Sequence, residues 1–277
     1  MTTTIQPPPR ALTIAGSDPS GGAGLQLDIT VFTRLGVHPM AIPTALTVQN
    51  STGVSAVTAL DAEGVERSLR AITRDMPPRA AKTGMLGTRA VVEAIARVTA
   101  GWPVPFLVID PVQRASSGPT LSDDGATGAM AKLLFPHAAL ITPNRYEAEQ
   151  LWGRPVRSPE DAVRCARELR EMGPRAVLIT GGHLEAEGIV DTLADEGGVT
   201  TWRHPRHPGP SPHGTGCALS AAITAHLALG RPLRESVRQA LVYVIHAIAS
   251  ATTPGSGRPY LGDGEGVSPI LDEAPIP

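Results

Sequence analysis

Short apolar runs alternate along this chain with longer segments in which apolar residues recur at every third or fourth position. The short runs predict strands that are buried on both faces of a sheet. The longer segments predict amphipathic helices. The predicted strands cover residues 11–15, 40–48, 80–83, 106–110, 139–141 and 176–180. The predicted helices cover residues 23–35, 62–75, 88–98, 123–134, 158–172, 218–229 and 233–249, with another from about 146.

Two helix starts and one hairpin carry more specific signals. Thr88 and Ser158 stand directly before helical segments, where a hydroxyl side chain accepts a hydrogen bond from the first turn. Residues 189–193 and 199–203 flank a turn at 196–198, and this pattern predicts a β-hairpin.

The alternation of strands and helices defines the predicted fold. Repeated β–α units with short buried strands imply an α/β architecture, a central and mostly parallel sheet flanked by helices on both faces. No internal repeat and no break in composition marks a linker, so residues 10–252 are predicted to form a single domain. Residues 1–9 are predicted to be a disordered tail, and residues 253–277 a Gly- and Pro-rich C-terminal tail. Ligands of such sheets bind at the carboxyl ends of the strands.

Composition and charge narrow the class of protein. With 42% hydrophobic and 18% charged residues, the chain has the composition of a globular protein. A net charge of −2 provides no basic footprint, so no nucleic-acid partner is expected. No apolar run is long enough to span a bilayer and the first residues lack an apolar signal core, so we expect no membrane partner and a cytoplasmic location. Cys165 and Cys217 are too few for a disulfide framework or a metal cluster, which fits a reducing compartment.

Two glycine-rich segments lie at predicted strand-to-helix junctions. Residues 16–24 (GSDPSGGAG) follow the first strand, and residues 214–217 (GTGC) begin a late helix. Glycines let the backbone approach a ligand closely, and free amides at a helix N-terminus attract anions. The first segment is neither a P-loop nor a G-x-G-x-x-G motif, and a tight turn is its alternative interpretation.

Cys217 falls in the first turn of the helix that the second segment begins. The helix dipole there favours the thiolate, so we expect a lowered pKa for this thiol. The alternative is a small buried thiol that packs a helix start.

Polar side chains follow three other predicted strands. Asn144 and Glu147 lie on one face of a helix start, where oxygen ligands suit Mg²⁺ held mostly through water, although this pattern taken alone favours a helix cap. Asp110 ends a strand, where its carboxylate can orient Mg²⁺ or cap the next segment. Gln49 can read the edge of a heteroaromatic ring, or it lies at a solvated strand end.

The order of these motifs resembles the ribokinase-like kinases, and within them the hydroxymethylpyrimidine/phosphomethylpyrimidine kinases of thiamin biosynthesis. The combination of HGTGC, TPNxxEA and GSDPSGGAG is highly specific at the family level. The resemblance implies a ribokinase-like fold in which residues 47–58 form a small β flap over the substrate site. The resembling stretches run in family order over nearly the whole chain: residues 14–29, 44–54, 82–87, 108–112, 117–121, 141–151, 179–183 and 213–230.

The resemblance also implies an activity and roles for individual residues. Such enzymes use ATP and Mg²⁺ to phosphorylate a primary hydroxymethyl group or its monophosphate, and the resemblance suggests a homodimer. The amides of Gly214, Gly216 and Cys217 would cradle the transferring phosphoryl group. Most ribokinase-like kinases carry an Asp base where the pyrimidine-kinase branch carries Cys, so Cys217 would be the base or would position the hydroxyl. The positions implied at the substrate are Gly16, Ala23, Asp28, Gln49, Met85 and Val112; those at ATP are Asn144, Thr180, Gly182 and Thr215; and those at Mg²⁺, through water, are Asp110 and Glu147.

The chain departs from the family pattern on the ATP side. The family usually has Met and Lys where this chain has Gln113 and Ser116, and Lys where it has Thr180. Only two of the 24 cationic residues are lysines, but a drift from lysine to arginine does not explain neutral replacements. Arg114 is a candidate replacement cation.

Three functions are therefore open. The first is a kinase of 4-amino-5-hydroxymethyl-2-methylpyrimidine, of its monophosphate, or of both. The second is a kinase of another hydroxymethyl heterocycle, such as pyridoxal or a pyrimidine of specialised metabolism. The third is a catalytically weakened kinase-fold protein that binds a ligand. Gln49 and Met85 favour a pyrimidine, whereas the missing lysines motivate the other two functions.

Overall fold

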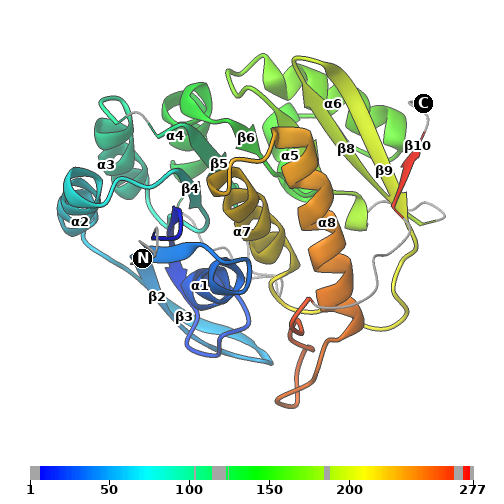
Figure 1. Cartoon of the computed structure of the whole chain (residues 1–277), viewed down its shortest axis with the longest axis horizontal. Helices are drawn as coiled ribbons and strands as arrows, with labels where there is room; N and C mark the ends of the chain where they lie inside the picture. Colours follow the sequence, from blue (N-terminus) through cyan, green and yellow to red (C-terminus); the bar gives the residue numbers. More distant parts are fainter. Residues whose placement is uncertain are drawn as a thin grey trace, which may run out of the picture.

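A single ten-stranded sheet runs through the part of the chain that the structure describes (Figure 1). The computed structural model describes residues 7–102, 104–113, 123, 125–183, 188–264 and 271–274. The strand order is β10-β9-β8-β7-β6-β5-β4-β1-β2-β3. The strands are β1 (Arg10–Ser17), β2 (His38–Asn50), β3 (Gly53–Ala59), β4 (Ala80–Thr83), β5 (Phe106–Ile109), β6 (Leu140–Ile141), β7 (Val177–Ile179), β8 (Ile189–Asp195), β9 (Gly198–His204) and β10 (Asp272–Ala274).

The direction of the strands confirms the predicted architecture. All neighbours from β2 through β1, β4, β5 and β6 to β7 are parallel. At one edge β3 runs antiparallel to β2, and at the other edge β8, β9 and β10 each run antiparallel to their neighbours. The central sheet is therefore mostly parallel, and β8 with β9 forms the predicted hairpin.

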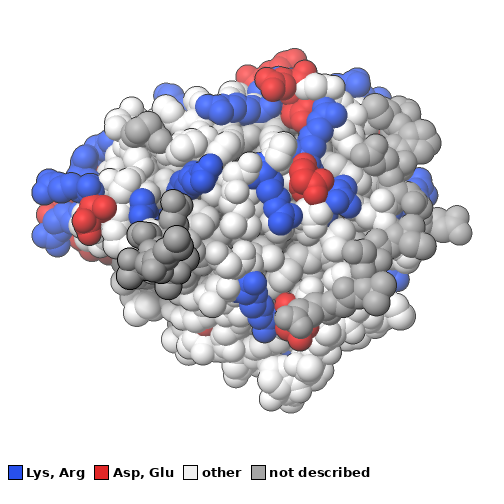
Figure 2. Space-filling view, in the orientation of Figure 1, with Lys and Arg blue, Asp and Glu red and all other residues white. Residues whose placement is uncertain are grey.

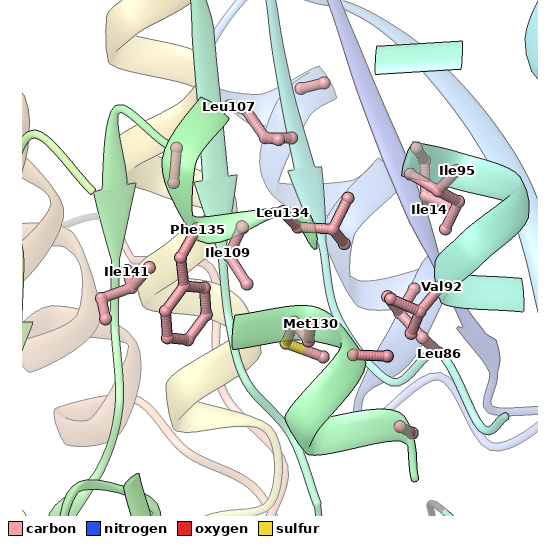
Figure 3. Close-up of a cluster of buried hydrophobic side chains, with 14 of the residues drawn as sticks. Ile14, Leu86, Val92, Ile95, Leu107, Ile109, Met130, Leu134, Phe135 and Ile141 are labelled. Carbon is pink, nitrogen blue, oxygen red and sulfur yellow. The ribbon is translucent and has the colours of Figure 1, made fainter. Parts of the chain in front are cut away.

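Helices cover both faces of the sheet (Figure 1). One face carries α1, α7 and α8, whose apolar residues form one buried cluster with the strands. The other face carries α2 to α6 and a second cluster, part of which Figure 3 shows. The helices are α1 (Gly24–Arg34), α2 (Ala62–Asp75), α3 (Arg89–Thr99), α4 (Ala126–Leu133), α5 (Arg145–Trp152), α6 (Pro159–Arg170), α7 (Thr215–Ala228) and α8 (Leu233–Ala249), with short 3₁₀ helices at Phe135–His137 and Gly181–His183.

The unbroken apolar runs of the central strands follow from burial on both faces. In β5, Leu107 and Ile109 point into the cluster under α2 to α6, whereas Val108 between them points into the cluster under α7. All three are at most 1% exposed. Each such side chain contributes about 1.5–3 kcal/mol through its removal from water.

Two helices begin with the caps that the sequence predicted, and a third begins later than predicted. The hydroxyls of Thr88 and Ser158 accept hydrogen bonds from the amides of Val91 and Asp161, as predicted. The helix predicted at 123–134 begins only at Ala126. The Asp123 carboxylate instead accepts the amide of Arg89 at 3.0 Å and that of Gly125 at 3.1 Å. Asp123 therefore supports the start of α3 and does not belong to α4.

Part of the segment predicted as a C-terminal tail packs on the domain. Thr252 pairs with Tyr260, and Tyr260 also pairs with His213, directly before α7. Further along, β10 adds to the edge of the sheet at β9. The tail predicted at residues 1–9 lies mostly outside the described residues.

The surface agrees with the small net charge. Figure 2 shows basic and acidic side chains interspersed on the face that it draws. None of the helices in the described part of the chain is both long enough and apolar enough to cross a membrane.

Candidate active site

A cavity of about 170 Å³ lies at the carboxyl ends of the parallel strands, next to the point where the sheet order reverses between β1 and β4. It gathers thirteen of the fifteen predicted site residues: Gly16, Ala23, Gln49, Met85, Asp110, Val112, Asn144, Glu147, Thr180, Gly214, Thr215, Gly216 and Cys217. Asp28 and Gly182 do not line it. Lining residues to which the sequence analysis assigned no individual role include Asp18, Thr47, Val54, Lys82 and His213. Arg114, Ser116 and the stretch 117–121 lie outside the described residues.

The glycine-rich loop between β1 and α1 forms one wall of this cavity. Gly24 begins α1 at φ +57°, and a Cβ there would overlap the carbonyl oxygen of Gly16. Glycine is the residue that tolerates both this φ and this close approach. The amide of Asp18 donates to Oε1 of Gln26 at 2.9 Å, which ties the loop to the helix.

The start of α7 forms the adjoining wall. Gly214 is its N-cap at φ +83°, and no side chain caps the first turn. A Cβ on Gly214 would overlap the carbonyl oxygen of Gly22 in the first glycine-rich loop. The uncapped amides of α7 therefore stand beside the cavity, an arrangement that favours an anion there.

Cys217 lies in this first turn, and its thiol accepts a hydrogen bond from the backbone amide of Gly24. Burial raises the pKa of the thiol to about 12; the charge of Lys82 opposes the shift, and the carboxylates of Asp110 and Asp28 add to it. The predicted lowering of this pKa is wrong for the ligand-free protein. The helix dipole is present, but the loss of solvent and the two nearby carboxylates outweigh it.

A buried ion pair lies beneath the cavity. Lys82 Nζ contacts Asp28 Oδ1 at 2.9 Å and Oδ2 at 3.0 Å, and both side chains are 0% exposed. The hydroxyl of Thr13 donates to Asp28 Oδ2 at 2.6 Å. The prediction that Asp28 contacts the substrate is corrected, because its carboxylate is enclosed by these two partners. Lys82 itself reaches the cavity, and it is the one lysine or arginine among the described lining residues.

Two carboxyl groups line the cavity near the ends of β5 and β6. The Asn144 amide donates to Glu147 at 2.9 Å, and the Gln113 amide donates to the same carboxyl group. The side chain of Asn144 in turn accepts two amides of α5, so the predicted helix cap is present together with the cavity position. Burial raises the pKa of Glu147 to about 8, with the charge of Asp110 adding to the shift. Burial raises the pKa of Asp110 to about 6, against the opposing charge of Lys82.

The hairpin of β2 and β3 contributes the flap that the resemblance implied. Its residues Thr47, Gln49 and Val54 line the cavity. Thr47 donates its hydroxyl to the carbonyl of Ser17 at 2.9 Å, which fixes the base of the flap to the glycine-rich loop. Met85 lines the cavity at the end of β4.

The C-terminal segment fastens the flap and the loop to each other. Tyr260 donates its hydroxyl to Ser20 at 2.7 Å in the glycine-rich loop, and the Arg258 amide donates to the Ser51 carbonyl at 2.9 Å at the tip of the flap. His213, 3.4 Å from the Asp18 carboxylate, packs against Tyr260. His213 could have been found through its place in HGTGC, but no sequence signal pointed to Tyr260.

We expect replacement of Tyr260 with phenylalanine to loosen this fastening. Loss of the hydroxyl removes one hydrogen bond, so the free energy of unfolding falls by about 1 kcal/mol. Amide exchange at residues 257–260 becomes faster, and mass-spectrometric hydrogen exchange measures it. Tyr146→Phe is the matched control, because Tyr146 is 58% exposed. Unchanged exchange in Tyr260→Phe would contradict the assignment.

A second cavity, of about 250 Å³, lies on the other side of the start of α7. Thr180, Thr215 and Gly216 line both cavities, and Gly182 lines only this one. Four apolar residues of α8 form one wall: Leu241, Val244, Ile245 and Ile248. Polar and basic residues of β8, β9 and the following loop form another: Asp191, His204, Arg206 and His207.

A parallel sheet with two adjoining cavities, an uncapped glycine-rich helix start and paired carboxyl groups defines a phosphotransferase with a ribokinase-like fold. Residues 18–261 match the family model described as phosphomethylpyrimidine kinase. The chain belongs to this family.

The curated relatives agree with the assignment. The chain is 41% identical over 246 residues to the thiamine biosynthesis bifunctional protein ThiED of Geobacter sulfurreducens, covering 89% of this chain and 50% of that longer protein. It is 39% identical over 255 residues to the hydroxymethylpyrimidine/phosphomethylpyrimidine kinase of Synechococcus elongatus, covering 92% of this chain and 97% of that one.

The solved structures to which this chain is similar include both phosphomethylpyrimidine kinase and pyridoxal kinase. Phosphomethylpyrimidine kinase from Clostridium difficile 630 matches with a TM-score of 0.78 and 37% identity, over 87% of this chain and 99% of that one. Pyridoxal kinase from Staphylococcus aureus, in complex with AMP-PCP and pyridoxal, matches with a TM-score of 0.86 and 31% identity, over 96% of this chain and 99% of that one.

Proposed function

We propose that this protein transfers the γ-phosphoryl group of ATP to the hydroxymethyl group of 4-amino-5-hydroxymethyl-2-methylpyrimidine, to the phosphate of its monophosphate, or to both. The observation that carries the proposal is the first cavity. There the start of α7 meets the Asp110 and Glu147 carboxyl groups and a flap that bears Gln49. The names of the curated relatives support the pyrimidine as acceptor.

The acceptor occupies the first cavity in this proposal. Gln49 provides an amide that can pair with the ring nitrogens and amino group of a pyrimidine. Met85 offers a polarisable sulfur to the ring, and Ala23 and Val112 supply apolar contact. The flap excludes the water that would otherwise compete with the acceptor.

The nucleotide occupies the second cavity, with its phosphate chain directed toward the first. The apolar wall of α8 suits the base. Thr180 and Thr215 line both cavities, and Gly182 lines the second. Complexes of the pyridoxal kinase relatives with ADP and AMP-PCP support ATP as the donor.

The donor set suits Mg²⁺, which binds in proteins through one or two carboxylates while it keeps several waters. Two buried carboxyl groups with raised pKa values, Asp110 and Glu147, stand together in the cavity. They would hold the ion through water, with Asn144 beside them. A bound Mg²⁺ supplies positive charge that offsets the charge of the phosphates.

The chain's own groups then position the transfer. The acceptor oxygen attacks the γ-phosphorus, its proton leaves, and ADP departs. The amides of Gly214, Gly216 and Cys217 stabilise the charge on the transferring oxygens. The Cys217 thiol contacts the acceptor oxygen and orients it or takes its proton.

The raised pKa values predict a pH-dependent magnesium requirement. Below about pH 6 both Asp110 and Glu147 hold protons, which a cation must displace; above about pH 8 both are ionised. We therefore expect the Mg²⁺ concentration for half-maximal rate to fall as pH rises from 6 to 8, by up to about tenfold per unit. Steady-state rates measure this. Glu147→Gln keeps the acceptor for the Asn144 amide and should flatten the upper part of the profile; an unaltered profile would reject the assignment.

Pyridoxal is the second candidate acceptor, because the pyridoxal kinase structures match with high TM-scores. The deciding experiment measures kcat/KM for hydroxymethylpyrimidine, its monophosphate and pyridoxal with ATP and Mg²⁺. We expect at least a tenfold preference for one of the pyrimidines. A preference for pyridoxal would replace the first proposal by the second. If no phosphoryl transfer to any of the three compounds were detected, the remaining hypothesis would be a catalytically weakened protein that binds a ligand.

We further propose a cytoplasmic homodimer. Both cysteines are free thiols, which fits a reducing compartment. The flap exposes apolar side chains away from the cavity, with Leu46 51% and Val48 61% exposed, and such surfaces mark contacts between proteins. Light scattering on a size-exclusion column tests the dimer.

A further inference from the structure

The polar wall of the second cavity contains an ion pair that the transfer step does not use. His204 Nε2 lies 3.1 Å from Asp191 Oδ2, and both side chains are buried. The pair joins the two strands of the hairpin, since Asp191 belongs to β8 and His204 ends β9. Both residues line the cavity.

The surroundings of His204 favour its protonated form. Its Nδ1 lies 3.2 Å from the carbonyl oxygen of Pro205, and its Nε2 faces the Asp191 carboxylate. Both neighbours are acceptors, so each ring nitrogen needs a hydrogen, and only the imidazolium has both. Burial by itself would lower the pKa of His204, but the hydrogen bond and charge of Asp191 outweigh it and raise the pKa. Arg206 is the other charged group that acts on this ring, and it opposes the shift.

The pair and Arg206 together hold the turn at residues 181–182. Asp191 Oδ1 accepts the amide of Gly181 at 2.9 Å, so one carboxylate binds both the imidazolium and the turn. Arg206 donates to the carbonyl of Gly182 at 2.7 Å. A Cβ on Gly181 would overlap the backbone of Val190 in β8, so the turn lies directly against that strand.

The turn has a position that suits contact with a ligand. Gly182 lines the second cavity, and a Cβ there would meet no atom within 4 Å. Neighbouring Thr180 lines both cavities but is neutral. The basic groups among the described residues that line the second cavity are His204, Arg206 and His207. This cavity thus has an apolar wall on α8 and a polar wall that bears basic groups, which matches a base joined to a phosphate chain.

We propose that Asp191, His204 and Arg206 form a clamp that sets the turn at residues 181–182 against the phosphate chain of the nucleotide. This inference rests on the proposed function, in which the second cavity binds ATP. The three are positioning residues: they fix a backbone turn that contacts the nucleotide and leave the acceptor and Cys217 untouched. Loss of the clamp therefore weakens nucleotide binding without slowing transfer in the saturated enzyme.

The test compares His204→Ala, His204→Gln, Asp191→Asn, Arg206→Ala and Arg206→Lys in the full chain. ADP affinity is measured by calorimetry, and KM for ATP, KM for the acceptor and kcat by steady-state kinetics. We expect His204→Ala, Asp191→Asn and Arg206→Ala to weaken ADP binding and raise KM for ATP by about tenfold or more. Acceptor KM and kcat should stay within about twofold, and the conservative variants His204→Gln and Arg206→Lys should recover part of the loss. Arg203→Gln, an exposed neighbour on β9, is the control.

The pH profile separates positioning from a merely structural role. As pH rises through the raised pKa of His204, the imidazolium loses its charge, so wild-type KM for ATP should rise, whereas His204→Gln should show no such rise. Unchanged ADP affinity in the Ala and Asn variants, or a fall in kcat at constant KM for ATP, would overturn the clamp. Failure of the wild type to bind ADP would overturn it as well. A wild type that binds ADP but phosphorylates none of the three acceptors would overturn the proposed function alone.

Discussion

Replacing Cys217 with alanine is expected to lower kcat by about 10²–10⁴ while leaving the fold and the KM for ATP nearly unchanged. The thiol stands in the first turn of α7 and receives the amide of Gly24 from the first turn of α1. Two helix N-termini thus converge on this sulfur, and the proposed function places the acceptor oxygen beside it. No other cysteine can substitute, since Cys165 is buried in the core on the far face of the sheet.

Two further variants decide which role the thiol has. With a pKa raised to about 12, the thiol is protonated at neutral pH in the ligand-free protein, which favours orientation of the hydroxyl as its main contribution. If Cys217 orients the acceptor hydroxyl, Cys217→Ser should recover much of the activity that Cys217→Ala loses. If it takes the proton, aspartate should recover more than serine, because a carboxylate at a helix start is an ionised base. Rates within about threefold of wild type for Cys217→Ala would contradict both roles.

Replacing Lys82 with methionine should lower the free energy of unfolding by about 3–5 kcal/mol. The change leaves the Asp28 carboxylate fully buried with only the Thr13 hydroxyl as partner. It also removes the charge that holds down the pKa values of Asp110 and Cys217. We therefore expect lower activity in addition to lower stability. Urea unfolding and steady-state kinetics measure the two effects.

The double variant Lys82→Met with Asp28→Asn provides the control. It removes both charges, and the asparagine still offers an oxygen to Thr13, so we expect it to recover more than half of the lost stability. Recovery of stability without recovery of activity would show that the charge of Lys82 acts on the cavity. If the single variants Lys82→Met and Asp28→Asn both had a free energy of unfolding within about 1 kcal/mol of wild type, the ion-pair argument would be refuted.

The sequence located most of the first cavity because of how parallel strands end. Gly16, Asp110 and Thr180 are far apart along the chain, but each lies at the carboxyl end of a parallel strand of one sheet, so all three meet at one edge. The same reasoning could not find Tyr260, because its contact with Ser20 spans 240 residues and follows no periodic pattern. In the second cavity the sequence pointed to Thr180, Gly182 and Thr215, but not to the walls on α8 and β9, since these elements come together only in the folded chain.

By itself, the sequence determined the elements, their order and the glycine positions at which backbone must approach backbone. These features depend on the spacing of apolar residues along the chain and on the steric limits of each residue's backbone, and neither depends on tertiary contacts. The tertiary structure alone decided the titration of the buried groups: it placed Lys82 against Asp28 and raised the pKa values of the Cys217 thiol, Asp110 and Glu147. Burial and the distances between charges set these properties, and both arise only when distant segments pack together.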